Sequence, residues 1–449
     1  MTFALQDPDI PAMAGSAVAT TTEVHPVGLA ALLALIVLLW LLPRQWLPLP
    51  MILLLSLVPA GQRLLVGGID FSFIRMLSWM TYVRMFVRKD LRRLELNLLD
   101  RLFLVWCGVL IVQGTLLGGT LTVFINRLGF ALDALTIYFF FRTVIQNYDN
   151  LILIGRMFAF TSIPVFLFFV FESQTSRNLF HFMGGVPEFT DIRDGRLRCQ
   201  GAFAHPIIAG CFWAQILPLH ILAGLVTHRW LTAITGLAFA IGIILLTASS
   251  TPVMAIVFGV LGFVMYFFRS GMRWYRWMIL AWLLILHYIL MDKPVYHLLA
   301  RIDLVGGSTG YHRYNIIDKS IDHFSEWWRF GTMTTAHWGY GCQDITNQFL
   351  LEGVNGGLLR LAMFLAMVVT TFVGVSRSMR SPVLSATAKK AAWILGTAMF
   401  MHCLNFIAIS YFEQATVIWY MTLAAISSLT LVPGCDVAPD PALSRSARA

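Results

Sequence analysis

The sequence has little charge for its length. Charged residues make up only 12% of the 449 residues, whereas a soluble domain carries roughly 25%. Hydrophobic residues reach 58%, and the mean hydropathy is +0.74. This balance excludes a secreted scaffold, a nuclear regulator and a soluble enzyme. It predicts an all-α, polytopic membrane protein.

Motifs for metals and nucleotides are missing as well. The six cysteines form no CxxC pair and no paired Cys/His spacing, so the sequence indicates neither a zinc site nor a disulfide framework. No glycine-rich loop with Lys-Ser/Thr follows a strand, so coupling to ATP within this chain is unsupported. The net charge of +9 implies no nucleic-acid partner, because excess Lys and Arg in a membrane protein belong in cytoplasmic loops. We expect no cofactor and no metal.

Long apolar runs dominate the chain. A spanning helix needs about 20 mostly apolar residues, with about 17 tolerated. A further run at 71–87 is ambiguous, because Arg75 and Arg84 are costly at the bilayer centre and the run could lie in the interface instead. Without that run we expect twelve spans, near residues 27–43, 48–66, 101–119, 126–144, 151–171, 205–226, 230–249, 252–268, 277–291, 349–374, 391–411 and 415–432.

Basic residues indicate how these spans are oriented. They gather between spans at 88–93, 269–276 and 377–390. Threading the spans places all three groups on one side, which the positive-inside rule identifies as cytoplasmic. Residues 1–43 contain three acidic residues but no Lys or Arg. That composition favours an external N-terminus and a thirteenth span, and it argues against a signal peptide.

Two long loops are expected on the outer side, at 172–204 and 292–347. Loops longer than about 12–15 residues are usually functional or disordered. The aromatic residues of the second loop favour order, and the apolar spacing over 311–328 predicts an amphipathic helix. Function outside the bilayer must therefore be built from these two loops.

Three arginines stand at the outer mouth of a span, against the positive-inside trend. They are Arg193, Arg196 and Arg198, and a planar guanidinium fork fits phosphate oxygens. Pairing with nearby acids is an equally good reading of Arg193 and Arg196, so Arg198 is the better candidate for binding an anion. Basic residues on the polar face of the 311–328 helix are most often only solvated.

Two features of the outer loops have alternative readings. Asp344 or Thr346, which precede the returning helix, would each make an ordinary N-cap. Cys199 and Cys342 are the cysteines of the outer loops, where either a disulfide or two free thiols would fit.

The order of several short motifs resembles the O-antigen ligase/polymerase (Wzy-type) family. Residues 198–206 read Arg-Cys-Gln-Gly-Ala-Phe-Ala-His-Pro and residues 246–250 read Leu-Thr-Ala-Ser-Ser. Gly339-Tyr-Gly341, Asn347-Gln-Phe-Leu and Gly356-Gly357 follow. The resemblance covers about residues 172–374. It implies a bacterial inner-membrane glycosyltransferase of the GT-C kind, which handles an oligosaccharide on undecaprenyl pyrophosphate at the periplasmic face without metal or nucleotide sugar.

Two departures from the family pattern bear on the activity. Thr346 stands where ligases of this family usually have histidine, and Ser250-Thr251 replaces a common Ser-Arg. The run Asp344-Ile-Thr346-Asn347 is more similar to exopolysaccharide repeat-unit polymerases, so we expect a polymerase. A ligase that joins polymer to the lipid A core, and a flippase for lipid-linked oligosaccharide, are the alternatives.

The resemblance and the chemistry together suggest roles. The pyrophosphate leaving group needs preorganised hydrogen-bond donors. We expect Arg198 and Arg313 to supply them, and Arg301 as a third candidate. Arg313 lies in a loop where the family commonly has a basic residue. Asp344, His205 and His337 are the candidates for the base that deprotonates the acceptor hydroxyl.

The expected partners are the carrier-linked oligosaccharide, membrane lipid, a flippase and chain-length or export proteins. The expected regions are N-terminal transmembrane helices at 1–171, a catalytic region at 172–374, C-terminal transmembrane helices at 375–432 and a cytoplasmic tail at 433–449.

Overall fold

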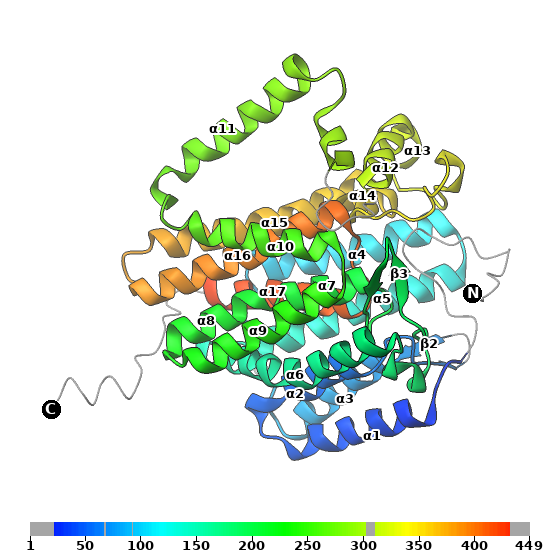
Figure 1. The fold of residues 1–449 in the computed structure, drawn as a ribbon, viewed down its shortest axis with the longest axis vertical. Helices are drawn as coiled ribbons and strands as arrows, with labels where there is room; N and C mark the ends of the chain where they lie inside the picture. Colours follow the sequence, from blue (N-terminus) through cyan, green and yellow to red (C-terminus); the bar gives the residue numbers. More distant parts are fainter. Residues whose placement is uncertain (1–21, 67–68, 92, 302–309, 432–449) are drawn as a thin grey trace.

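The computed structural model describes residues 22–66, 69–91, 93–301 and 310–431. Within these ranges the chain is almost entirely helical, with two short β-hairpins. Most helices run side by side, so that the links between them gather at two opposite ends (Figure 1). Six of the described helices are long and apolar enough to cross a membrane, and a bent pair would make a seventh. The expected all-α, multi-pass membrane architecture is confirmed at this level.

Six helices form the N-terminal half, and polar caps set several of their starts. Asn97 caps α4, where its side chain and that of Asp100 form a reciprocal capping box. Asn147 is likewise the N-cap of α6, where its side chain accepts the N–H of Asn150. A 3₁₀ turn, Arg44–Trp46, joins the first two helices. The helices are α1 Pro26–Leu41, α2 Pro48–Leu57, α3 Phe73–Val87, α4 Leu98–Gly118, α5 Leu121–Val144 and α6 Tyr148–Thr175.

The other helices outside the two long loops follow the first of these loops. They are α7 Pro206–Ala214, α8 Leu217–Thr227, α9 Trp230–Leu246, α10 Ser250–Val264, α11 Met272–Ile285, α14 Gln348–Val354, α15 Gly357–Arg380, α16 Ala386–Ala408 and α17 Gln414–Thr430. A 3₁₀ turn, Arg269–Gly271, precedes α11, and a π-helical turn, Leu286–Leu290, continues it. Two of the expected spans are interrupted. Pro218 lies in the first turn of α8, after a break in 205–226, and Gly357, with φ +65°, starts α15 after a break in 349–374.

The expected span at 48–66 is wrong. Its helix, α2, has ten residues and ends at Leu57. At 1.5 Å per residue it is about 15 Å long, roughly half the hydrocarbon core. Val58 is extended because Pro59 follows it, and the chain then forms the hairpin of β1 Arg63–Val66 and β2 Ile69–Ser72.

The expected spans at 252–268 and 277–291 form a bent pair. The axes of α10 and the following helical segment differ by 93°. No residue of α11 is buried, and its Trp274 and Trp277 side chains are largely exposed. Figure 1 shows α11 leaving the body of the molecule.

Helix α3 belongs to the bundle, because it packs against α1, α2 and α5. Arg75 forms a two-pronged ion pair with Asp133 of α5, at 2.7 and 2.6 Å. The Arg84 side chain is 1% exposed and binds Asp90 at 2.5 Å and the Leu42 carbonyl at 2.7 Å. These partners offset the cost of placing arginine at this depth. The two arginines of this apolar run are therefore accommodated as ion pairs.

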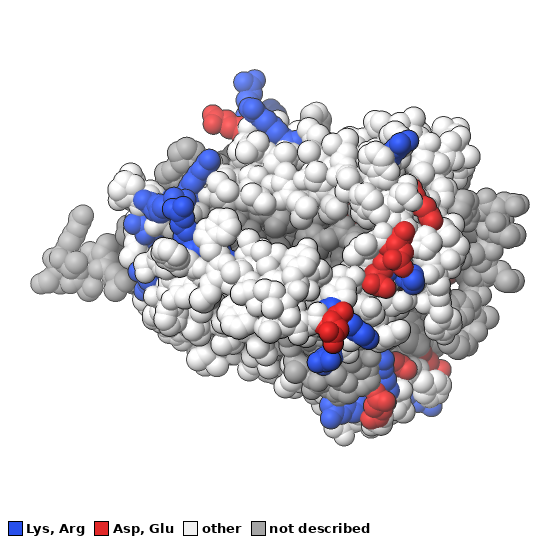
Figure 2. Space-filling view, turned by 90° about the horizontal axis from the view of Figure 1, so that it is seen from above, with Lys and Arg blue, Asp and Glu red and all other residues white. Residues whose placement is uncertain are grey.

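The two ends of the helices differ in charge. Figure 2 shows Lys and Arg side chains gathered at the end where α10 meets α11 and α15 meets α16, while most Asp and Glu lie toward the other end, interspersed there with Lys and Arg. This asymmetry agrees with the sequence-based orientation, in which the basic end is cytoplasmic.

The outer loops form ordered structure at the other end. The first loop contains a 3₁₀ turn, Leu179–Met183, and a hairpin of β3 Asp191–Arg193 and β4 Arg196–Arg198. The predicted amphipathic helix at 311–328 is confirmed, with a break at His323. The second loop contains η5 Val295–Arg301, α12 Gly310–Asp322, α13 Phe324–Trp327 and η6 Ala336–Trp338. The expected N-terminal orientation at 1–21 and the tail at 433–449 lie outside the described residues.

Candidate functional site

The β3–β4 hairpin presents a basic face. Asp194 and Gly195 form its turn with φ of 49° and 73°, as a type I′ turn requires. Strand residues two apart, and residues directly opposite, share a face of a hairpin. Asp191 pairs with Arg198 and Arg193 with Arg196, so one carboxylate and three guanidinium groups lie on one face.

A buried carboxylate fixes the chain that follows this hairpin. Glu172, at the outer end of α6, is 1% exposed and accepts the N–H groups of Gln200 and Gly201 at 3.0 and 2.9 Å. The Thr190 hydroxyl also donates to it, at 3.0 Å. Gly201 has φ +56°, and a Cβ there would lie 2.5 Å from the Phe169 ring. The 198–206 motif is therefore held rigidly against the helix bundle.

Arg198 and Arg313 converge on the link between α9 and α10. The Arg198 Nη2 donates to the Ser249 hydroxyl at 3.1 Å, and the Arg313 Nη2 donates to the Thr251 hydroxyl at 2.9 Å. Arg313 Nε also donates to the Ala408 carbonyl at 3.1 Å. Both arginines are largely buried, at 5% and 9% exposed. The structure thus brings together the two arginines that the sequence favoured.

Positive charge is in excess here. Burial, together with the nearby Arg193 charge, lowers the pKa of Arg198 and of Arg313. The Asp191 carboxylate, 3.4 Å from Arg198, is the acid that pairs with this group among the described residues. Arg198 Nε is buried and has no hydrogen-bond partner there. A dianionic ligand would satisfy both the charge and this donor.

His205 lies in the same field. Its Nδ1 accepts the Ile207 N–H at 3.2 Å and so caps α7. Although the ring is solvent-exposed, partial desolvation by the surrounding protein and the Arg198 charge lower the pKa of His205 to about 4. The ring is therefore neutral near pH 7, with Nδ1 engaged and the proton on Nε2. In this geometry His205 presents a donor to the site rather than a base.

Asp344 lies on the neighbouring link. Desolvation raises the pKa of Asp344, while the nearby His312, which precedes Arg313 on α12, opposes that rise. Asn347, rather than Asp344 or Thr346, caps α14, and its amide donates to the Ile407 carbonyl at 3.1 Å. Ile407 is next to the Ala408 carbonyl that Arg313 binds. Asp344 therefore lies near His312, in the link before α14, and has no capping role.

The structure places His337 and Arg301 elsewhere. His337 binds Glu326 at 2.8 Å, next to His323. His323 follows Arg313 by ten residues along α12, which is about 15 Å of helix. Arg301 is exposed at the end of η5, whose Tyr296 binds Asp318 in the middle of α12. Neither residue shares a contact with Arg198 or Arg313 among the described residues.

A cavity of about 440 Å³ is lined in part by the link at 409–413. Tyr411 and Phe412 of this link line it, three or four residues from the Ala408 carbonyl. It lies between α4, α5, α14, α15 and α17. Its walls combine aromatic and ionisable side chains, among them Trp106, Trp419, Arg127, Glu352 and Arg360.

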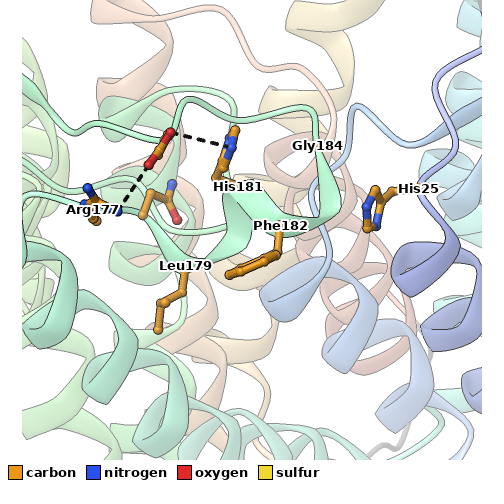
Figure 3. A pocket seen from close by; sticks show the side chains of 8 residues that line it. His25, Arg177, Leu179, His181, Phe182 and Gly184 are labelled. Carbon is orange, nitrogen blue, oxygen red and sulfur yellow. Dashed lines mark ion pairs between the residues drawn. The ribbon is translucent and has the colours of Figure 1, made fainter.

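A second, more open pocket lies over the first outer loop and offers a weaker anion site. In Figure 3, dashed lines join Arg177 and His181 to the carboxylate between them, which is Glu188. The Arg177 Nη1 to Glu188 distance is 3.4 Å, and the Arg177 side chain is 63% exposed. The arginine here is already neutralised and solvated, so we place the functional site at Arg198 and Arg313.

Sequence reasoning missed several supporting residues. Ser249 and Thr251 were noticed only as part of a motif, although their hydroxyls orient both arginines. A lone acid at the end of an apolar run, such as Glu172, was an available signal. Cys199 and Cys342 are both buried free thiols, so the alternative of a disulfide between them is wrong.

The fold and the site define a multi-pass membrane protein with an arginine-rich site at the end opposite its basic links. No protein-family model matches the chain, and no curated protein matches it in sequence. The function must therefore be argued from the geometry.

Proposed function

We propose that this protein is a polysaccharide polymerase, which transfers oligosaccharide repeat units from undecaprenyl pyrophosphate to a growing exopolysaccharide or O-antigen chain. The observation that carries the proposal is the convergence of Arg198 and Arg313 on the α9–α10 link. Buried, preoriented guanidinium groups with excess positive charge suit a pyrophosphate. The Wzy-type resemblance of residues 172–374 supports the same reading.

In the proposed reaction the acceptor hydroxyl attacks the anomeric carbon of the donor oligosaccharide. A glycosidic bond forms, and the bond from that carbon to the pyrophosphate oxygen breaks, with its electron pair leaving on the pyrophosphate. Arg198 and Arg313 stabilise that developing charge. Asp344 takes the hydroxyl proton. The reaction as proposed needs no metal.

The cavity beside the link at 409–413 is proposed to hold the acceptor chain. Its aromatic walls offer faces for sugar rings, and its charged groups offer hydrogen bonds to hydroxyls. Because Arg313 binds the Ala408 carbonyl at the end of α16, directly before this link, donor and acceptor would meet near it. The exposed apolar surface of the helices would lie against the carrier lipid and the bilayer.

The proposed setting is the bacterial inner membrane, with a multi-pass helix bundle of GT-C type and the two long loops in the periplasm. The charge asymmetry of the two ends supports this orientation. In this proposed orientation Arg198, Arg313 and Asp344 would face the periplasm, where lipid-linked repeat units would be polymerised.

The proposal is tested by incubating the purified protein in detergent with lipid-linked repeat units. We expect a ladder of products that lengthens by one repeat unit per step, separated by gel and weighed by mass spectrometry. The matched control is Arg177→Ala, which removes an exposed outer arginine and should leave the ladder intact. Arg198→Ala should abolish it. An Arg198→Ala protein that forms the wild-type ladder at the wild-type rate would contradict the proposal.

One observation favours a different class of function. Ion pairs between spans, such as Arg75 with Asp133, and an ionisable cavity among the helices are features of transporters. A flippase for lipid-linked oligosaccharide would move labelled donor across proteoliposomes without lengthening it. A ligase would transfer finished polymer to a lipid acceptor and leave single repeat units unjoined.

A further inference from the structure

The second outer loop contains a cluster of metal-ligating side chains that the proposed reaction does not use. His323 lies between α12 and α13, Glu326 lies within α13, and His337 lies in η6. The His323 Nδ1 is 2.7 Å from Glu326 Oε1, and the His337 Nε2 is 2.8 Å from Glu326 Oε2. One ligand atom from each residue lies within 4.8 Å of the other two.

Two imidazoles and one carboxylate are the ligand types of a zinc site with one open position. Tetrahedral zinc with bonds of about 2.0–2.1 Å separates its ligand atoms by about 3.3 Å. The contacts of 2.7 and 2.8 Å are made to different oxygens of Glu326, and one ligand atom from each residue lies within 4.8 Å of the other two. A zinc ion therefore needs small rotations of these three side chains, which are partly exposed.

Trp338 supplies the support that metal ligands usually receive from neighbouring groups. Its indole N–H donates to Glu326 Oε2 at 2.9 Å, which orients the carboxylate. Its ring stacks on His323, with centroids 5.3 Å apart and planes 9° apart.

We propose that His323, Glu326 and His337 bind a zinc ion, with water at the fourth position. The ion joins α13 to η6, which directly precedes the link that holds Asp344. It stabilises the fold of the second outer loop and takes no part in glycosyl transfer. The inference does not rest on the proposed polymerase activity, because it is argued from ligand chemistry alone.

The test measures bound metal on the full-length protein, purified in detergent with its affinity tag removed. The protein is stripped with EDTA, reloaded with zinc sulfate, dialysed and analysed by inductively coupled plasma mass spectrometry. We expect about one zinc per chain in the wild type, and binding weakened by at least about tenfold in Glu326→Gln and His337→Ala. The matched control is His181→Ala, because His181 has a single carboxylate neighbour and should be irrelevant to zinc.

Cobalt substitution gives a second readout on the wild type, independent of how well the variants fold. Four-coordinate Co²⁺ at this site should show intense visible absorption bands that Glu326→Gln lacks. The proposal is overturned if the reloaded wild type holds no zinc, if Glu326→Gln and His337→Ala retain as much zinc as the wild type, or if bound Co²⁺ shows only the weak bands of an octahedral ion. None of these outcomes depends on polymer synthesis, so failure here is distinct from failure of the proposed function.

Discussion

Arg198 and Arg313 come from different outer loops, yet they bind hydroxyls only two residues apart, on Ser249 and Thr251. Both guanidinium groups are largely buried, Arg193 is a like charge near each, and among the described residues Asp191 is the carboxylate that pairs with Arg198. Such an arrangement costs free energy unless an anion completes it. This relationship is the physical basis of the proposed pyrophosphate site.

Replacing either arginine by lysine tests the importance of the guanidinium fork. Arg198→Lys and Arg313→Lys keep the charge but lose two of the directed donors. Loss of one charge-assisted hydrogen bond, at about 1.5–3 kcal/mol, predicts a decrease in chain-growth rate of about 10- to 100-fold. Gel-based initial rates with lipid-linked donor provide the measurement. Arg177→Lys should match the wild type, and equal rates in all three variants would remove the fork from the mechanism.

Asp344→Asn tests the proposed base. We expect no polymer and an accumulation of lipid-linked single repeat units, which thin-layer chromatography of extracted lipids measures. Because desolvation raises the pKa of Asp344, the wild-type rate should fall with decreasing pH already above the ordinary value near 4, as the carboxylate takes up its proton. His205→Gln should leave this acid limb in place, since His205 Nδ1 is engaged by the helix. An acid limb that persists in the residual activity of Asp344→Asn would assign the base to another residue.

The buried pair of Arg360 and Glu352 should matter for stability. Arg360 Nε lies 2.7 Å from Glu352, which also accepts the Trp106 indole N–H at 3.0 Å. Glu352→Ala leaves the buried guanidinium without its counter-charge, at a cost of about 3–5 kcal/mol. Thermal unfolding in detergent should therefore shift markedly downward. Asp322→Asn, which breaks the exposed pair with Lys319, serves as the control and should leave the unfolding temperature unchanged.

Cysteine labelling tests the orientation. Ile192 of β3 is 64% exposed and Val383, between α15 and α16, is 78% exposed. A cysteine at either position would therefore be exposed to the reagent. In a background without reactive native cysteines, a membrane-impermeant maleimide should label Ile192→Cys in spheroplasts. Val383→Cys should react only after permeabilisation. The reverse pattern would move the arginine site to the cytoplasm. Ser173 remains a usable label, while Ser308 lies outside the described residues.

Periodicity and apolar length predicted the helices well where the chain follows simple rules. The runs that became α4, α5 and α6 were anticipated within a few residues, because each is long, apolar and capped. The run at 48–66 was read as one span because hydropathy does not register that Pro59 ends a helix. Arg75 and Arg84 made α3 ambiguous, because their partners, Asp133 and Asp90, are known only from the tertiary structure.

The candidate site was anticipated in part. Charge against the topological trend pointed to Arg198, and the family resemblance pointed to Arg313. Their convergence could not be read from the sequence, since it depends on how two loops fold onto the α9–α10 link. His337 was a candidate base together with Asp344 and His205, whereas in the structure it binds Glu326.

The most direct test of the central claim compares binding of undecaprenyl pyrophosphate and undecaprenyl monophosphate to purified protein. Equilibrium binding in detergent would be measured for the wild type, Arg198→Ala and Arg313→Ala, with Arg177→Ala as the control. If the two arginines hold the pyrophosphate, the wild type and the control should prefer the diphosphate by at least about tenfold, and the two other variants should lose that preference. A wild type that binds both lipids equally, or a preference that survives in Arg198→Ala and Arg313→Ala, would contradict the account.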